Sequence, residues 1–386
     1  MRLSLAASAR FLSKLVLIFL MLQAGLARER GPRVDVVCPA SPIPVKVEDK
    51  QVLVYELHVT NFDTVPLTLK KLEVFADTDK SQPLKTFSDA ALSAIMTEAG
   101  TVTGAKDSQT ISPAKRAVVF LWVEIGSDQR IPASLSHRMV FVAGTPAEGS
   151  AAAETTLEDF SVAVSQDAVP LLSPPFAGGV WLAGDGPSNN SGHRRSIAAI
   201  DGHIHSPERF AIDWVKVGPN GDSHDGVSRN ENWWGYGEPI LSVADGEVTQ
   251  IADGIPENTP RVLPKLVTLD NIAGNYVIVR IGSNRYATFA HLQPGSIKVR
   301  LHDHVRRGDV LARLGNSGNA TGPHLHFQVT DGNSVLQSEG VPFIFDKFTY
   351  LGPGSDYEVD KHPSIPRERS IPGDTGVVEF PPAKKQ

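Results

Sequence analysis

The sequence predicts a mainly β protein of two successive domains. Short runs rich in β-branched and aromatic residues recur through most of the chain, and Gly, Pro and Asn separate them. No long stretch repeats with the period of a helix. The length of 386 residues is enough for about two domains, and a hydrophobic content of 41% allows each to bury a core.

The first 27 residues have the pattern of a signal peptide. Arg2, Arg10 and Lys14 supply positive charge around the start of an apolar run at residues 15–22, and small residues lead up to Ala27. Because this run is too short to span a bilayer comfortably, we expect cleavage after Ala27 and export to the periplasm or the medium. No stable membrane insertion is expected after cleavage. The alternative is an uncleaved membrane anchor.

Residues 28–168 are expected to form an immunoglobulin-like β-sandwich. The runs at residues 52–60, 65–75 and 117–125 suit strands, and turn residues separate them. We find no catalytic constellation in this half. Cys38 is the only cysteine, so an exported chain has no internal disulfide, and its stability must come from ordinary cores.

A passage rich in Pro and Gly at residues 170–187 marks a domain boundary. Residues 169–352 are dense in short strands broken by glycine turns, which predicts a second β domain. Residues 353–386 are rich in Pro, Gly and charge, and we expect them to form a flexible C-terminal tail.

Charge and motif content exclude several kinds of function. The net charge of -6, with no basic stripe, argues against nucleic acid and against an anionic membrane surface as partners. The sequence contains no Gly-x-Ser-x-Gly elbow, no His-Glu-x-x-His helix and no phosphate-binding loop. A serine hydrolase, a thermolysin-like peptidase and a nucleotide-binding enzyme are therefore disfavoured.

The segment that carries chemistry is GNSGNATGPHLHFQV, at residues 315–329. Side chains alternate between the faces of a strand, so His324 and His326 point the same way and can share one metal site. A pair of surface histidines is the alternative. His291 ends a second strand, YATFAHL, and Asp213 stands in the apolar strand FAIDWV. A buried carboxylate there needs a cation, a metal or hydrogen bonds.

These segments resemble the lysostaphin/LytM-type zinc metallopeptidases, the β-lytic endopeptidase family. The resemblance covers roughly residues 175–335 and implies an antiparallel β-sheet peptidase domain. Its motifs occur in the family's order and are AID at 211–213, PILSVADGEV at 239–248, GNYVIV at 274–279, Ala-His-Leu at 290–292 and GPHLH at 322–326.

The resemblance implies one Zn²⁺ ion held by a His, an Asp and the second His of the His-x-His pair. Carried over, Asp213 and His326 are metal ligands, and His291 and His324 are catalytic. The implied substrate is a peptide, in the cross-links or stem peptides of peptidoglycan. Together with the signal peptide, this predicts an exported zinc metalloendopeptidase.

One position departs from the family's pattern. The first zinc ligand lies four residues before the Asp in the family, and this chain has Arg209 there. A guanidinium offers no acceptor atom for a metal. We favour His193 as the replacement, in a segment similar to one in some family members, with the intervening residues looping back as an insertion. His205 is the second choice and His203 the third.

Arg209 also keeps a different function open. Some proteins with this resemblance have lost ligands and act as binding modules that activate another cell-wall hydrolase. The sequence leaves that alternative beside the peptidase, and a third possibility is that no further ligand replaces the missing histidine.

Overall fold

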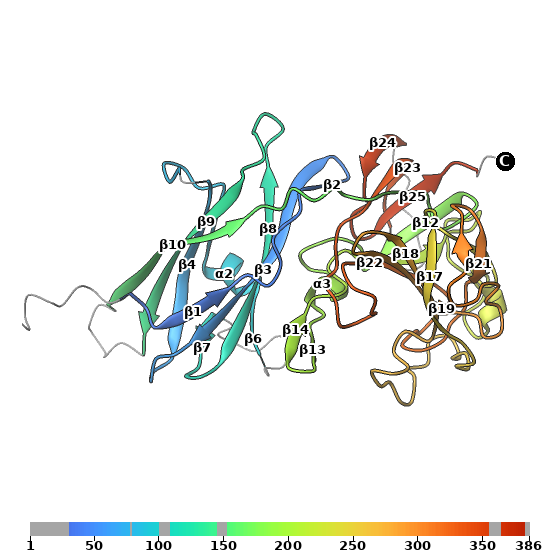
Figure 1. Ribbon diagram of the computed structural model, residues 1–386, viewed down its shortest axis with the longest axis horizontal. Coiled ribbons are helices and arrows are strands. Elements are labelled where there is room, and N and C mark those ends of the chain that lie inside the picture. Colours follow the sequence, from blue (N-terminus) through green and yellow to red (C-terminus); the bar gives the residue numbers. More distant parts are fainter. Residues whose placement is uncertain (1–30, 78, 100–108, 145–152, 355–363, 383–386) are drawn as a thin grey trace, which may run out of the picture. The chain divides into compact units, whose positions relative to one another are not determined.

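Strands dominate the computed structural model of the chain (Figure 1), which describes residues 31–77, 79–99, 109–144, 153–354 and 364–382. The prediction of a mainly β protein is confirmed. The signal peptide expected at residues 1–27 lies outside the described residues. No helix in the described ranges is long and apolar enough to cross a bilayer.

The chain divides into two compact units that alternate along the sequence. The first comprises Met1–Val37, His58–Val119 and Ser136–Ser161, and the second comprises Cys38–Leu57, Phe120–Leu135 and Val162–Gln386. The limits between the units cut through strands β3 (Lys50–Asn61) and β8 (Arg116–Ile125), so each of these strands supplies residues to both. The domain boundaries expected from the sequence stay predictions.

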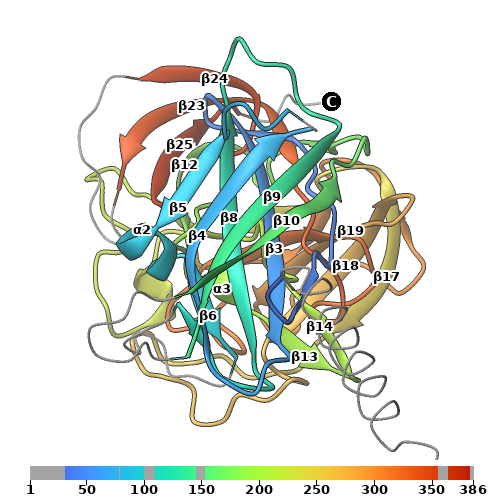
Figure 2. The ribbon, with the colours of Figure 1, turned by 90° about the vertical axis from the view of Figure 1, so that its left-hand side faces the viewer.

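The N-terminal strands form two sheets. In one, the order is β1-β3-β8-β6 with β2 on β3, and in the other it is β10-β9-β4-β5 with β7 on β4. Figure 2 shows β4, β5, β9 and β10 side by side. A short helix, α2, follows β5, and the immunoglobulin-like character stays a prediction. The bounds are β1 Val34–Val37, β2 Val45–Val47, β4 Leu67–Ala76, β5 Lys85–Ser88, α2 Asp89–Ser93, β6 Met96–Glu98, β7 Thr110–Ile111, β9 Ser134–Ala143 and β10 Glu154–Ala163.

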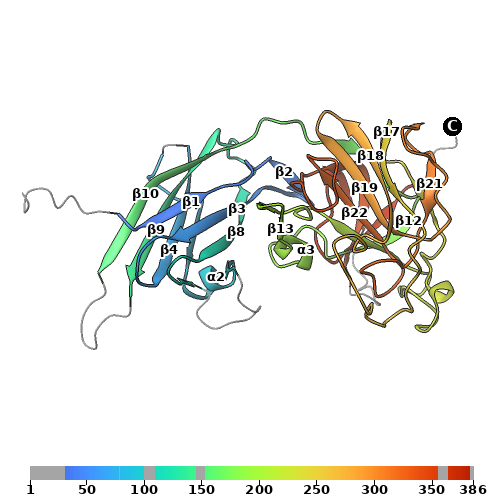
Figure 3. The same cartoon turned by 60° about the horizontal axis from the view of Figure 1, so that its bottom comes forward.

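Eleven strands of the described chain form one large sheet in the second unit. Its order is β11-β23-β25-β12-β15-β22-β19-β18-β17-β20, with β24 on β23, and Figure 3 shows β17, β18, β19 and β22 next to one another. All neighbours except β11 and β23 are antiparallel, as predicted. The bounds are β11 Leu171–Leu172, β12 Gly179–Gly184, β15 Ile212–Lys216, β17 Gly246–Ala252, β18 Asn275–Gly282, β19 Arg285–Leu292, β20 His304–Val305, β22 Leu325–Thr330, β23 Ile344–Pro353, β24 Ile365–Ser370 and β25 Gly376–Phe380.

Smaller elements complete the second unit. Helix α3 (Gly192–Arg195) is a single turn, and a hairpin of β13 (Ala198–Ile200) and β14 (His203–His205) follows it. Strands β16 (Pro239–Leu241) and β21 (Val310–Arg313) pair with each other, and η1 (Asn230–Asn232) is a short 3-10 helix.

The register of the central strands brings distant parts of the sequence together. Asp213 on β15 pairs directly with His326 on β22, and Ala290 on β19 pairs with His326 from the other side. Directly opposed residues in a sheet have Cβ atoms about 5 Å apart, so their side chains can interact. On β22, Leu325 and Phe327 enter the apolar core, which leaves His326 on the opposite face.

The prediction of a flexible tail at residues 353–386 is wrong for most of the described residues in this range. Strand β25 lies between β12 and β23 in the large sheet, and β24 pairs with β23. Val377, Val378 and Phe380 are buried in the core. The local composition is rich in Pro and charge, but the hydrogen-bond partners and the apolar surface come from strands far away in the sequence, so composition alone is misleading here.

Candidate metal centre

Three histidines surround one carboxylate at the centre of the large sheet. His326 Nδ1 lies 2.9 Å from Asp213 Oδ1, and His193 Nε2 lies 3.5 Å from the same oxygen. His324, just before β22, places its Nε2 3.5 Å from Asp213 Oδ2. The rings of His193 and His326 are 4.8 Å apart, centre to centre.

His291 completes the group from the end of β19. Its ring centre is 4.8 Å from that of His324 and 5.8 Å from that of His326. The backbone φ of His291 is +62°, in the left-handed region that non-glycine residues rarely adopt. All five residues expected from the sequence to form the site therefore lie together.

Backbone carbonyls fix the tautomer of three of the rings. The Nδ1 atoms of His193, His291 and His324 each lie 2.8–2.9 Å from a carbonyl oxygen. A carbonyl oxygen only accepts, so Nδ1 carries the proton, and Nε2 of the neutral ring keeps its lone pair. The three carbonyls belong to Asp185, Ser317 and Gly322.

A side-chain amide does the same for His326 through the other nitrogen. Gln328 donates from Nε2 to the carbonyl of Val335 at 2.8 Å, which turns its Oε1 toward the ring. His326 Nε2 lies 2.8 Å from this oxygen and must be the donor. In the neutral ring, the lone pair of Nδ1 then faces Asp213, which is repulsive unless a proton or a cation lies between them.

The donor set fits a zinc ion. Two imidazole lone pairs, from His193 and His326, converge with a carboxylate oxygen of Asp213, and these are ligand types that zinc prefers. The remaining ring nitrogens are held by acceptors, as is usual for metal-binding histidines. Three protein ligands of this kind leave a fourth tetrahedral position for water or substrate.

The charges of the site are strongly coupled. Burial acts to raise the pKa of Asp213, but His193, His324 and His326 lower it overall. Burial acts to lower the pKa of His326, but the hydrogen bond and charge of Asp213 raise it to about 9. Burial, with the neighbouring rings, lowers the pKa of His291. Without a metal, His326 and Asp213 form an ion pair, and His291 stays neutral near pH 7.

The metal-free protein is expected to lose stability as the pH rises from about 6.5 to about 9. Folding raises the pKa of His326 from 6.5 to about 9, so the ion pair contributes fully below the lower value and is lost through the higher one. At about 1.4 kcal/mol for each pH unit, the loss is about 3 kcal/mol. Urea unfolding of chelator-treated protein across this range measures it. His326→Gln should remove the fall, and an unchanged slope in that variant would refute the assignment.

The other histidines considered as first ligand lie elsewhere. His205 places its Nδ1 3.3 Å from Glu339 Oε1, and the ring of His203 is 6.4 Å from that of His205. Arg209 directs its guanidinium to Glu56, Glu339 and the carbonyl of Gly340. Helix α3 precedes the β13–β14 hairpin, so the chain leaves the site after His193 and returns to it at Asp213.

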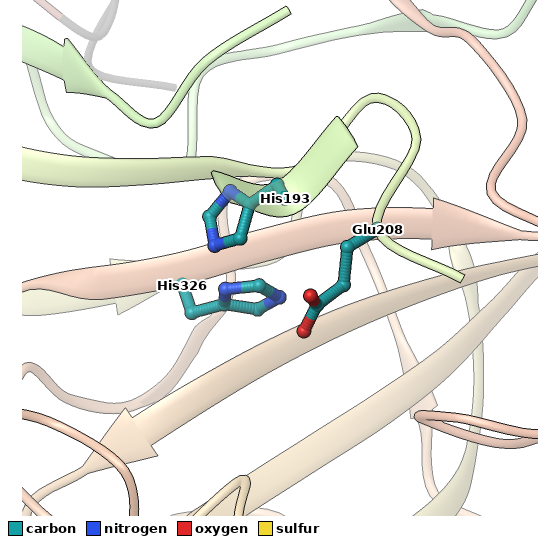
Figure 4. Close-up of side chains that lie close together, drawn as sticks. All are labelled: His193, Glu208 and His326. Carbon is teal, nitrogen blue, oxygen red and sulfur yellow. The ribbon is translucent and has the colours of Figure 1, made fainter. Parts of the chain in front are cut away.

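Sequence reasoning missed two acidic residues beside the site. Ligand atoms of His193, Glu208 and His326 lie within 4.8 Å of one another, and Figure 4 shows these three side chains turned toward a common space. Asp185 forms a similar group with His193 and Asp213. Both carboxylates belong to loops, where no periodicity identifies them.

Comparison with known proteins identifies the domain that carries three of the four histidines of the site. The family model described as "Peptidase family M23" matches residues 223–337. The matched range contains His291, His324 and His326, whereas His193 and Asp213 precede it.

The chain is similar over short stretches to peptidases of several bacteria. It is 31% identical over 93 residues to an uncharacterized metalloprotease of Buchnera aphidicola, covering 24% of this chain and 20% of that protein. It is 39% identical over 57 residues to the peptidoglycan DD-endopeptidase ShyA of Vibrio cholerae, covering 15% and 13%. The catalytic domain of lysostaphin from Staphylococcus simulans shares 17% identity at a TM-score of 0.21, over 31% of this chain and 84% of that domain.

The matched stretches span one fifth or less of the length of the curated relatives. The resemblance predicted from the motifs is confirmed by the family match. The chain therefore contains a domain of peptidase family M23.

Proposed function

We propose that the protein is an exported zinc metalloendopeptidase that hydrolyses peptide bonds in the cross-links or stem peptides of peptidoglycan. The observation that carries this proposal is the convergence of two histidine lone pairs on the carboxylate of Asp213, beside two further histidines. The substrate class rests on similarity to proteins named peptidoglycan DD-endopeptidases.

In this proposal His193, Asp213 and His326 hold the metal. A zinc ion bound there would acidify a water molecule and polarise the carbonyl of the substrate. The carbonyl of Asp185 and the amide of Gln328 keep the two rings in the tautomers that offer a lone pair to the ion.

His291 and His324 supply proton transfer and stabilise negative charge. Each has its Nδ1 tied to a backbone carbonyl, so its Nε2 carries a lone pair that can accept the proton of an attacking water. A protonated ring can return that proton to the leaving amine, and the second ring can stabilise the oxyanion of the tetrahedral intermediate. The lowered pKa of His291 keeps this ring neutral near pH 7.

A binding module without catalysis is the second candidate, and Arg209 is the observation that favours it. The residue occupies the position of the family's first ligand and cannot bind a metal. His193 weakens this alternative, because its lone pair already faces Asp213.

Digestion of purified peptidoglycan by the full-length protein tests the proposal. We expect release of soluble peptide fragments, loss of that release after treatment with a zinc chelator, and its recovery when zinc is restored. The control is the same protein kept with zinc throughout. Full zinc occupancy without cleavage of peptidoglycan or of any peptide would overturn the peptidase in favour of the binding module.

A further inference from the structure

Glu56 is a fully buried carboxylate in the middle of β3. Its neighbours Tyr55 and Leu57 are also fully buried. A charge in such a place is strongly unfavourable unless it is paired and hydrogen-bonded. Burial acts to raise the pKa of Glu56, but two guanidinium groups lower it to about 2, so it is ionised.

The first partner is Arg209. Its Nε donates to Glu56 Oε1 at 3.0 Å and its Nη2 to Oε2 at 2.8 Å, which is a side-on bidentate pair. The same guanidinium donates to the carbonyl of Gly340 and to Glu339 Oε2, each at 2.6 Å. Arg209 is thus held from three sides, four residues before Asp213.

The second partner is Arg194, which is fully buried and follows His193 directly in helix α3. Its Nη1 donates to Glu56 Oε1, and its Nη2 donates to the carbonyl of Tyr55 at 2.9 Å. The guanidinium also lies over the ring of Phe120, 5.0 Å from its centre. Glu56, Arg194 and Arg209 all belong to the second compact unit.

Helix α3 needs such an anchor. It is one turn of four residues, and a helix of this length is not stable by itself. The hydroxyl of Ser191 caps it by accepting from the backbone of Arg194 at 3.3 Å. A further restraint on the direction of His193 comes from Arg194, whose guanidinium is bound to Glu56.

We propose that Glu56 is a positioning residue for the metal centre. One carboxylate joins the segment that carries His193 to the segment that carries Asp213, and so sets the separation of the two ligands. A buried ion network adds little net stability over apolar side chains of similar volume, but its hydrogen bonds define directions. Arg209 stands at the position of the family's first ligand. Through Glu56 it anchors helix α3, which supplies the proposed replacement ligand, His193.

This inference rests on the proposed function, and zinc affinity tests it. In the full-length protein, Glu56→Gln should raise the Kd for zinc by about 10- to 100-fold, as replacements that disturb ligand orientation do. Competition with a chromophoric chelator measures the Kd, and the far-UV circular dichroism of the metal-free protein reports its fold. The matched control is Glu124→Gln, which neutralises an exposed carboxylate on β8 that pairs with Lys50, and it should bind zinc like the wild type.

Arg194→Lys provides a second, milder variant. It retains the positive charge beside Glu56 but cannot reproduce the fork of hydrogen bonds to Glu56 and Tyr55. It should weaken zinc binding in the same direction and change the visible spectrum of the cobalt-substituted protein, which reports ligand geometry. A loss of stability alone would not move that spectrum.

The outcomes separate the two proposals. Wild-type zinc affinity and cobalt spectrum in either folded variant would overturn the positioning role of Glu56 and leave the proposed function intact. Loss of the fold in both variants would make the role purely structural and overturn it as well. A wild-type protein without affinity for zinc would overturn the proposed function and this inference together.

Discussion

Replacement of His326 by alanine is expected to weaken zinc binding by roughly 100- to 1,000-fold. Binding of zinc at structural sites is worth about 10–16 kcal/mol for about four ligands, so each ligand contributes about 2.5–4 kcal/mol. His326 is 5% exposed and lies at the centre of the sheet, so water cannot simply take its place with the same geometry. Peptidase activity should fall below detection at ordinary zinc concentrations.

Metal analysis after dialysis and a chelator-competition Kd measure this effect. His193→Ala should give a loss of similar size, because the lone pair of His193 faces the same carboxylate. His205→Ala is the matched control, since its imidazole lies against Glu339. Full zinc occupancy in His326→Ala would rule out His326 as a ligand. Loss of zinc in His205→Ala with retention in His193→Ala would reverse the assignment of the first ligand.

Replacement of His291 by alanine is expected to lower kcat by about 100- to 10,000-fold while zinc remains bound, which is the usual contribution of a general acid or base. His291 lies beside His324, and its ring lies next to the proposed metal ligand His326, while its Nδ1 is directed away to the carbonyl of Ser317. The lost interaction would act on the transition state, so kcat and kcat/KM should fall together. His324→Ala should give a loss of the same kind.

Steady-state hydrolysis of a peptide substrate, with zinc content measured on the same sample, tests this expectation. His302→Ala is a suitable control, because that exposed imidazole contacts Glu247. A His291→Ala protein with full zinc and near wild-type kcat would remove His291 from the catalytic machinery. Loss of zinc in that variant would instead make His291 part of the metal centre.

Much of the site can be predicted because local patterns carry it. The alternation of a strand places His324 and His326 on one side of β22, with Leu325 in the core. Asp213 is conspicuous as a single carboxylate in an apolar strand, and its pairing with His326 follows from the order of the sheet. The alternation and the isolated carboxylate need only the sequence and the geometry of a strand.

The identity of the first ligand does not follow from local sequence patterns. His193 lies twenty residues before Asp213 in the sequence, with the β13–β14 hairpin between them, and no spacing rule predicts where such an insertion returns. Resemblance to a segment of some family members favours His193 over His205 and His203. Only the fold shows the His193 ring next to that of His326.

The parts that sequence reasoning missed all depend on distant contacts. Glu56 reads as one polar residue in an amphipathic strand, and its two arginine partners lie more than 130 residues away. Glu208 belongs to a loop with no periodicity. Strand β25 lies in a segment whose composition is typical of a flexible tail. Its pairing with β12 cannot be read from that composition, so the strand was missed.

X-ray absorption at the zinc edge of the purified full-length protein tests the metal centre most directly. We expect one zinc ion per chain with two imidazole nitrogens and carboxylate or water oxygens at about 2.0–2.1 Å. The signal of one imidazole should disappear in His193→Ala. A chain that takes up no zinc, or a metal shell without histidine, would contradict the assignment of His193, Asp213 and His326 as the ligands.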